Sequence, residues 1–124
     1  LVAAAGASYS ARWTTVQMEN LVLSIKDGLK NPGFSFIEVA TQCPTYYGRK
    51  NKLKTPTAMA AVMKANTIFK SEADRMRPRD VEGKIVVGEF ANTQRDEFTQ
   101  NIEKLSVEKS GKKTLINSAY ETEL

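Results

Sequence analysis

The N-terminal third of this chain has the pattern of a strand, a helix and a second strand joined by short links. Segment 8–13 places Tyr9 and Trp13 on one alternating face, which predicts a strand. A helix is predicted over 15–30 because apolar side chains recur there at helical spacing, giving one stripe that we expect to be buried. That stripe comprises Met18, Leu21, Val22, Ile25 and Leu29. The apolar run at 34–40 predicts a largely buried, central strand, and two strands joined by such a helix should be parallel neighbours.

The rest of the chain continues the alternation of helices and strands. Segment 70–83 is charged and contains Pro78 and Gly83, so we expect a surface connection there. The predicted fold class is α/β, a three-layer-like part of a larger domain with mainly parallel strands. The strands are predicted at about 8–13, 34–40 and 84–90, and the flanking helices at about 15–30, 56–69 and 94–109.

Several residues mark where the helices should begin and end. Thr14 or Thr15 is expected to cap the first helix, and Thr55 followed by Pro56 is a strong start for the second. Thr93 with Asp96 resembles a capping box that would open the last helix, and Gly111 would end it. Residues 1–6 are typical of a final helical turn closed by Gly6, and the sequence has no initiating Met. We therefore expect the chain to be part of a longer protein.

Length and composition limit the classes of function. A chain of 124 residues suits one domain with a modest core. No apolar run approaches the ~20 residues needed to cross a bilayer, and residues 1–5 lack the features of a signal peptide, so a cytoplasmic protein is expected. The net charge of +4 is small for a dedicated nucleic-acid binder. One cysteine and no histidine exclude an intrachain disulfide, and Ser-His-Asp or Cys-His catalysis, within this sequence.

Cys43 is the sharpest candidate for chemistry. It follows the end of a predicted central strand, where α/β sheets place ligands and catalytic groups, and Pro44 fixes the backbone after it. A thiolate there could ligate iron or act as a nucleophile. The alternative is a half-buried cysteine that fills space, and spacing alone favours this alternative because one cysteine cannot hold a cluster.

A basic run at 49–54 carries four cations in six residues. Such a run could bind phosphate, a carboxylate substrate or an acidic protein, although composition alone favours a solvated loop. Tyr46 and Tyr47 beside it invite base stacking, but no RNA-binding motif supports that interpretation. Glu38 and Glu89 lie in predicted strands, and each could be a functional carboxylate near a strand end; edge positions or charge partners are favoured, since no spacing links the two. Glycine-rich phosphate-binding motifs are absent from the sequence.

Four blocks of sequence occur in the order typical of one known family. They are AGASYSAR at 5–12, GFSFIEV at 33–39, CPTYYGR at 43–49 and KIVVGEF at 84–90. Together they resemble the β subunit of 2-oxoacid:ferredoxin oxidoreductases, most closely the 2-oxoglutarate type, over roughly residues 1–105. The resemblance implies thiamine diphosphate and Mg²⁺, oxidative decarboxylation of a 2-oxoacid with coenzyme A, and a 4Fe–4S cluster that passes electrons to ferredoxin. The family's diphosphate motif and remaining cluster cysteines belong to an N-terminal half that this sequence lacks.

The resemblance also implies roles for particular residues. Cys43 matches the remote ligand that completes the cluster nearest the thiamine. Arg49 is a candidate for reading the distal carboxylate of the substrate, since a guanidinium can pair with it bidentately. Residues 1–43 would belong to the C-terminal portion of the thiamine-diphosphate-binding domain, and 44–124 to a C-terminal extension of the β subunit.

The expected partners are the alpha and other subunits of the same oxidoreductase, ferredoxin, the 2-oxoacid and coenzyme A, with no nucleic acid and no membrane. We expect no catalytic residue in this segment and no turnover by it alone. The alternative function is a non-catalytic basic module that binds an acidic protein or RNA. Three strands are few to cover their helices, so an apolar face is expected to remain exposed, with dimerisation as a consequence.

Overall fold

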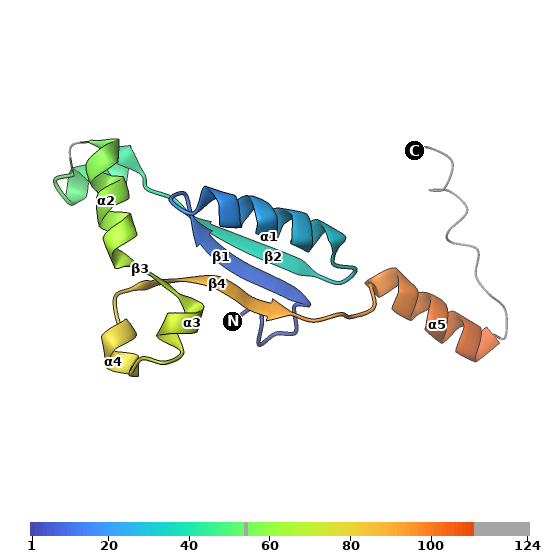
Figure 1. Cartoon of the computed structure of the whole chain (residues 1–124). Helices are drawn as coiled ribbons and strands as arrows, with labels where there is room; N and C mark the ends of the chain where they lie inside the picture. The colour runs from blue at the N-terminus through green and yellow to red at the C-terminus, as the bar shows by residue number, and fades with distance from the viewer. Residues whose placement is uncertain (54, 111–124) are drawn as a thin grey trace.

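The computed structural model describes residues 1–53 and 55–110, and a four-stranded sheet in the order β2-β1-β4-β3 forms its centre (Figure 1). The strands are β1 Tyr9–Thr14, β2 Ser35–Ala40, β3 Thr67–Phe69 and β4 Ile85–Asn92. The α-helices are α1 Met18–Lys30, α2 Pro56–Asn66, α3 Lys70–Ala73, α4 Pro78–Val81 and α5 Phe98–Ser110, and a short π-helix, η1, spans Pro44–Gly48. Among the described residues, no helix is long and apolar enough to cross a membrane.

The strand–helix–strand prediction is confirmed. β1 and β2 are parallel neighbours, in register from Tyr9 opposite Ser35 to Thr14 opposite Ala40, and α1 connects them. β3 is also parallel to its neighbour β4, whereas β4 runs antiparallel to β1 with an irregularity after Ser10. The sheet is therefore mainly parallel, as predicted for an α/β fold.

Helical segments lie against both faces of the sheet. α1 packs over β1 and β2 on one face (Figure 1). On the opposite face, the segment that carries α3 and α4 borders a hollow with Arg12 and Phe90 of the sheet. The segment predicted as a plain surface connection thus contains two short helices, and the layering agrees with the predicted three-layer arrangement.

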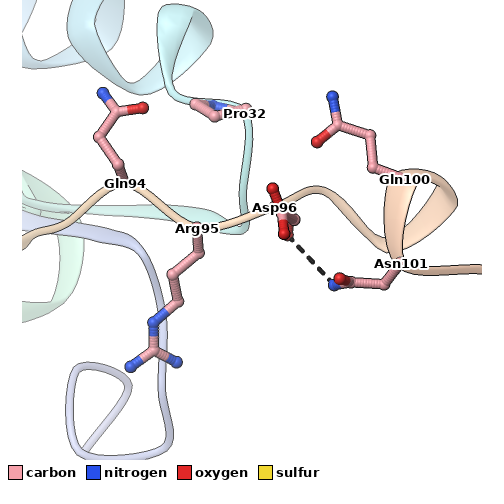
Figure 2. A pocket seen from close by; sticks show the side chains of 6 residues that line it. All are labelled: Pro32, Gln94, Arg95, Asp96, Gln100 and Asn101. Carbon is pink, nitrogen blue, oxygen red and sulfur yellow. Dashed lines mark hydrogen bonds between the residues drawn. The ribbon is translucent and has the colours of Figure 1, made fainter. Parts of the chain in front are cut away.

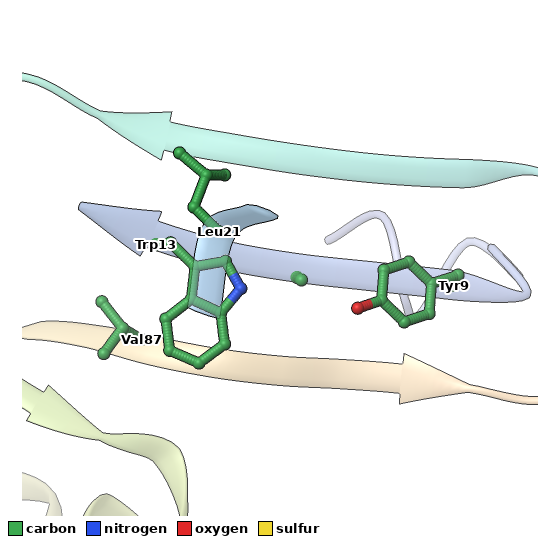
Figure 3. Packing of buried hydrophobic residues seen from close by; sticks show 5 residues of the cluster. Tyr9, Trp13, Leu21 and Val87 are labelled. Carbon is green, nitrogen blue, oxygen red and sulfur yellow. The ribbon is translucent and has the colours of Figure 1, made fainter. Parts of the chain in front are cut away.

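The hydrophobic core is centred on β1 (Figure 3). Tyr9 and Trp13 point to the same face, as their alternation predicted, and pack with Leu21 of α1 and Val87 of β4. The indole Nε1 of Trp13 donates a 2.6 Å hydrogen bond to the Ser24 hydroxyl. The polar atoms of the two large aromatic side chains are thus satisfied inside the core, since the Tyr9 hydroxyl donates to a Glu89 carboxylate oxygen at 2.9 Å.

The predicted buried stripe of α1 is wrong except at Leu21. The buried positions of the helix are Leu21, Ser24 and Gly28. Two of them are small because the helix lies close to the sheet: a Cβ on Gly28 would come within 3.2 Å of Ile37 Cδ1. Met18 and Leu29, at the ends of the predicted stripe, are 54% and 82% exposed.

The second strand also departs from the prediction of a largely buried, central strand. β2 is an edge strand, and none of its residues is fully buried. Its apolar run has the pattern of a buried strand. The sequence alone does not show that β2 has a neighbouring strand on one side only.

The helix boundaries agree with some capping predictions and correct others. Thr55 caps α2 as predicted, with its hydroxyl accepting the Ala58 N–H at 3.1 Å. Neither Thr14 nor Thr15 caps α1, whose N-cap is Gln17; the Thr15 hydroxyl instead donates to Gln42 Oε1 at 2.6 Å. The second helix ends at Asn66 rather than at 69, because β3 begins there and pairs with β4.

The last helix begins at Phe98, so the predicted capping box at Thr93 is wrong. The Thr93 N–H instead donates to the Ser8 carbonyl at 2.8 Å, which ties the end of β4 to the start of β1. The helix start is marked by the Glu97 N–H, which donates to Gln100 Oε1 at 3.2 Å. The predicted end at Gly111 lies outside the described residues.

The turn closed by Gly6 is confirmed. Gly6 has φ of +100°, its N–H donates to the Ala3 carbonyl at 3.1 Å, and the Ala7 N–H donates to the Val2 carbonyl at 3.2 Å. This pair of hydrogen bonds is typical of a helix end with glycine at C′.

Candidate functional site

Cys43 lies in a short turn directly after β2, at the C-terminal end of the edge strand. Its backbone begins η1, where the Gly48 N–H donates to the Cys43 carbonyl at 2.9 Å and Pro44 occupies the first helical turn. The side chain is a free, exposed thiol. The structure therefore confirms the strand-end position, while the half-buried, space-filling alternative is wrong.

The thiol of Cys43 has an environment that favours the thiolate. The pKa of Cys43 is lowered to about 7, first by the Thr45 hydroxyl and then by the backbone N–H groups of Tyr46 and Tyr47. The Thr45 Oγ1 lies 3.3 Å from Cys43 Sγ. A substantial fraction of the thiol is thus ionised at neutral pH, the form that binds metals and attacks electrophiles.

The loop that carries Cys43 is anchored on α2. Gly48 is buried against Met59, and a Cβ at this glycine would lie 2.8 Å from Met59 Sδ and 3.1 Å from the Leu53 carbonyl oxygen. The Leu53 N–H donates to the Gly48 carbonyl at 2.8 Å, which closes the loop. A small cavity of about 190 Å³ lies beside this contact. Its lining includes Gln42, Tyr47, Met59 and Met63.

The basic run presents its charges to solvent. Arg49 is exposed on the same loop as Cys43, and no carboxylate of residues 1–53 or 55–110 forms an ion pair with it. Lys50 lies over the ring of Tyr46, with Nζ at 4.6 Å from the ring centroid and 2.9 Å from the hydroxyl oxygen. The Lys54 end of the run falls outside the described residues.

The two strand glutamates have partners, as predicted. Glu38 pairs with Arg12 at 2.7 Å, and the Arg12 guanidinium lies 5.8 Å from the Phe90 ring centroid. Glu89 accepts the hydroxyl of Tyr9, whose pKa is raised to about 12, chiefly by burial. These contacts explain both carboxylates as structural groups on the sheet.

A second hollow lies at the opposite end of the molecule, where β4 leads into α5 (Figures 1 and 2). Polar side chains surround it, including Gln94, Arg95 and Asp96. Arg95 is directed to the N-terminal turn, where it donates to the Gly6 carbonyl at 3.0 Å. None of the residues that line this hollow was predicted from the sequence to be a site residue.

Thr45 is the residue that sequence reasoning missed in the Cys43 loop. The available signal was a hydroxyl two positions after the cysteine, which is close enough in sequence to reach the thiol across a turn. Nothing in the sequence indicated that Met59 would support Gly48.

Cys43 can supply only one ligand to a metal centre. In the part of the chain that the structure describes, no group of three His, Cys, Asp or Glu side chains could hold a metal ion. The donor set therefore fits a single remote thiolate ligand and does not fit a complete cluster or a Mg²⁺ site.

Comparison with known proteins identifies the family. The 2-oxoglutarate synthase subunit KorB of Methanothermobacter marburgensis is 53% identical over 120 residues, which make up 97% of this chain and 42% of that protein. This chain corresponds to a segment of a KorB-type β subunit. The KorB proteins of Methanothermobacter thermautotrophicus and Methanocaldococcus jannaschii are 54% and 49% identical, over 97% and 82% of this chain.

The KorB-type segment is shorter than its relatives. It spans 42% of the length of the two Methanothermobacter proteins and 38% of the Methanocaldococcus protein. No family model matches the chain. No solved structure matches it either. The resemblance to the β subunit is thus confirmed by sequence relatives.

Proposed function

We propose that this chain supplies part of the β subunit of a cytoplasmic 2-oxoglutarate:ferredoxin oxidoreductase. The proposal rests on the sequence identity of 53% and 54%, over 97% of this chain, to two relatives named 2-oxoglutarate synthase subunit KorB. The reaction is oxidative decarboxylation of the 2-oxoacid to its acyl-coenzyme A, with electrons passed to ferredoxin. In this proposal residues 1–43 belong to the C-terminal portion of the thiamine-binding domain and residues 44–124 to a C-terminal extension. The partners are the alpha and other subunits of the enzyme and ferredoxin.

The cofactors of the proposed enzyme are thiamine diphosphate with Mg²⁺ and a 4Fe–4S cluster. When bound, thiamine diphosphate would supply the electron sink for decarboxylation and a cluster would supply one-electron chemistry. The described residues contain no set that fits Mg²⁺. The proposal therefore assigns the Mg²⁺ site to other parts of the subunit and assigns only one cluster ligand, Cys43, to this segment.

The Cys43 loop has the properties that one remote ligand needs. The thiol is exposed and has a pKa of about 7, so loss of its proton on binding iron costs little near neutral pH. Thr45 and the η1 backbone stabilise its negative charge. The Gly48–Met59 contact fixes the loop against α2. The loop thus presents one thiolate from a fixed position.

The decisive experiment uses a full-length chimera. The matching residues of the M. marburgensis KorB are replaced by this chain, and the chimera is assembled with the other subunits of that enzyme. We expect ferredoxin reduction that depends on 2-oxoglutarate. A chimera that binds its cofactors and subunits but turns over no 2-oxoacid would contradict the proposed function.

The ligand role of Cys43 is tested in the same chimera. Cys43→Ala should lower the iron content and change the electron paramagnetic resonance spectrum of the cluster, while Cys43→Ser should disturb it less because an alkoxide can bind iron. Thr41→Ala, an exposed position on the same loop, is the control. An undisturbed cluster in Cys43→Ala would refute the assignment.

Arg49 is proposed to bind the distal carboxylate of 2-oxoglutarate. Arg49→Ala should raise the KM for 2-oxoglutarate by roughly 10-fold, the effect of losing a charge-assisted hydrogen bond, and leave the KM for pyruvate nearly unchanged. Lys50→Ala is the matched control, because Lys50 is a neighbouring exposed cation that contacts Tyr46 instead. Equal effects on both substrates would exclude this role.

The alternative is a non-catalytic module, and the exposed cations of the Cys43 loop favour an acidic partner such as ferredoxin. Binding to an acidic protein or to RNA through this loop should weaken steeply as salt rises. Arg49→Ala with Lys50→Ala should then abolish binding by the 124-residue chain. Absence of binding at low salt would remove the alternative.

A further inference from the structure

β2 ends the sheet on one side, and its outer edge is unpaired in the described structure. The carbonyls of Phe34 and Ala40 accept hydrogen bonds from the N–H groups of Tyr9 and Thr15, at 3.2 Å each. Backbone groups of alternate residues point to opposite sides of a strand, so Phe36 and Glu38 also face β1. The N–H and C=O groups of Ser35, Ile37 and Val39 consequently face the free edge of β2.

This edge lacks the features that usually protect an unpaired strand. Its sequence, SFIEVA, contains no proline and no lysine, and it pairs in parallel with β1. Strands of parallel sheets are normally covered on both faces and flanked by further strands. Phe36 and Val39 remain exposed on the two faces of β2.

The apolar stripe of α1 overhangs the same edge. Met18, Val22, Ile25 and Leu29 lie about a quarter turn from the buried positions Leu21, Ser24 and Gly28 at 3.6 residues per turn. Asp27 lies on the other flank of the helix, where its charge acts on Tyr9. Because the Asp27 flank faces β1 and β4, the stripe faces away from them, toward and beyond β2.

The free edge and the overhanging stripe form one continuous surface, and we propose that a β-strand from the rest of a KorB-length subunit occupies it. The inference rests on the proposed function, since the occupant comes from the part of KorB outside this segment. That part is more than half of each relative, because the chain covers 42% of the two Methanothermobacter proteins. The added strand pairs with Ser35, Ile37 and Val39, and its apolar side chains cover the α1 stripe.

Amide hydrogen exchange tests the pairing with an internal control inside β2. In the 124-residue chain, the Ile37 and Val39 amides should exchange quickly and the Phe36 and Glu38 amides slowly. In the full-length chimera, all four should be slow, with Ile37 and Val39 at least about 100-fold slower than in the short chain. Unchanged exchange at Ile37 and Val39 would overturn the proposal, as would a 124-residue dimer in which these amides are already protected.

Two neighbouring substitutions test the stripe. Val22 and Leu23 are both exposed, at 42% and 57%, but only Val22 belongs to the stripe. Val22→Asp should lower the thermal midpoint of the chimera by about 5 °C or more, and Leu23→Asp by about 1 °C or less. In the 124-residue chain, both substitutions should leave the thermal midpoint nearly unchanged. Equal effects of the two substitutions in the chimera would contradict the proposal.

These measurements are separate from turnover. A chimera that protects Ile37 and Val39 but does not act on 2-oxoglutarate supports the docking surface and contradicts the proposed function. A chimera that turns over 2-oxoglutarate with both amides unprotected supports the function and overturns the docking surface.

Discussion

The sheet around β1 and the loop that carries Cys43 are held in place by different kinds of contact. Around β1, Tyr9 and Trp13 pack with Val87, which is distant in sequence, and the Trp13 side chain is only 6% exposed. Between residues 43 and 53 of the Cys43 loop the hydrogen bonds join residues two to five positions apart, and Tyr46 is 65% exposed. Among the described residues, the loop is supported from the interior by the contact of Gly48 with Met59.

The difference indicates that the two regions respond to substitution separately. Loss of a buried aromatic side chain near β1 removes contacts among three elements and lowers the stability of the whole chain. A change in the loop alters the position or ionisation of one thiol, and the sheet has few contacts through which to respond. Substitutions in the loop should therefore change the position or pKa of the Cys43 thiol without unfolding the sheet.

The largest effect is expected from Trp13→Ala. This change empties the centre of the β1 core and leaves Ser24 without its indole donor, so the free energy of unfolding should fall by about 3–5 kcal/mol. Urea unfolding measures the change. Tyr46→Ala, at an exposed aromatic residue of the loop, should stay within about 0.5 kcal/mol. Similar losses in the two variants would erase the distinction between core and loop.

The next effect concerns the buried phenol of Tyr9. Its pKa is raised from 10.0 to about 12 in the folded chain, so folding favours the protonated form. At about 1.4 kcal/mol per pKa unit, the resulting stabilisation is about 3 kcal/mol; it is fully present below pH 10 and is lost as pH rises toward 12. Tyr9→Phe should remove this pH dependence. Parallel stability curves for both proteins between pH 9 and about 12 would show that Tyr9 does not titrate in this way.

A smaller, local effect is expected from Gly48→Ala. The new Cβ would meet Met59 Sδ at 2.8 Å, which should cost about 1–2 kcal/mol and displace the loop. The rate of Cys43 alkylation should change, while the fluorescence of Trp13 stays as in the parent chain. In a double-mutant cycle of Gly48→Ala with Met59→Ala, a coupling free energy near zero would show that the added methyl group does not contact the Met59 side chain.

The smallest effect on stability, and the sharpest at the site, is expected from Thr45→Val. Removing the hydroxyl should raise the Cys43 pKa above about 7, because that hydroxyl is the largest cause of its lowering. Iodoacetamide reaction rates between pH 6 and about 10 report the shift, with Thr41→Val as control. In the parent chain the lowered thiol pKa adds stability as pH rises from about 7 to above 9. Identical pH profiles for Thr45→Val and its parent would remove Thr45 from the site.

Local pattern was sufficient for several elements of the fold. The period-two spacing of Tyr9 and Trp13, the Thr55–Pro56 helix start and the turn at Gly6 depend on residues close in sequence, and the structure agrees with each. The blocks that include Cys43 were likewise sufficient to indicate the family. The buried face of α1 was not predictable, because Ser24 and Gly28 are buried by the closeness of the sheet rather than by their own hydrophobicity.

For the candidate site, the position of Cys43 after a strand and the cations beside it were predictable from local sequence. Local sequence could not show that Thr45 stabilises the thiolate or that Met59 supports Gly48, since both depend on the path of the loop. Whether Cys43 was exposed or buried also required the packing of neighbouring elements.

The strand–helix–strand unit and the place of a lone thiol at a strand end follow from local sequence, because hydrophobic period and turn chemistry are local properties. Tertiary contacts place β2 at an edge of the sheet, set β4 antiparallel to β1 and leave the α1 stripe uncovered among the described residues. The physical reason is that strand neighbours and buried faces arise from contacts between distant segments, and an apolar stripe has the same pattern whether it is covered within the chain or left for a partner.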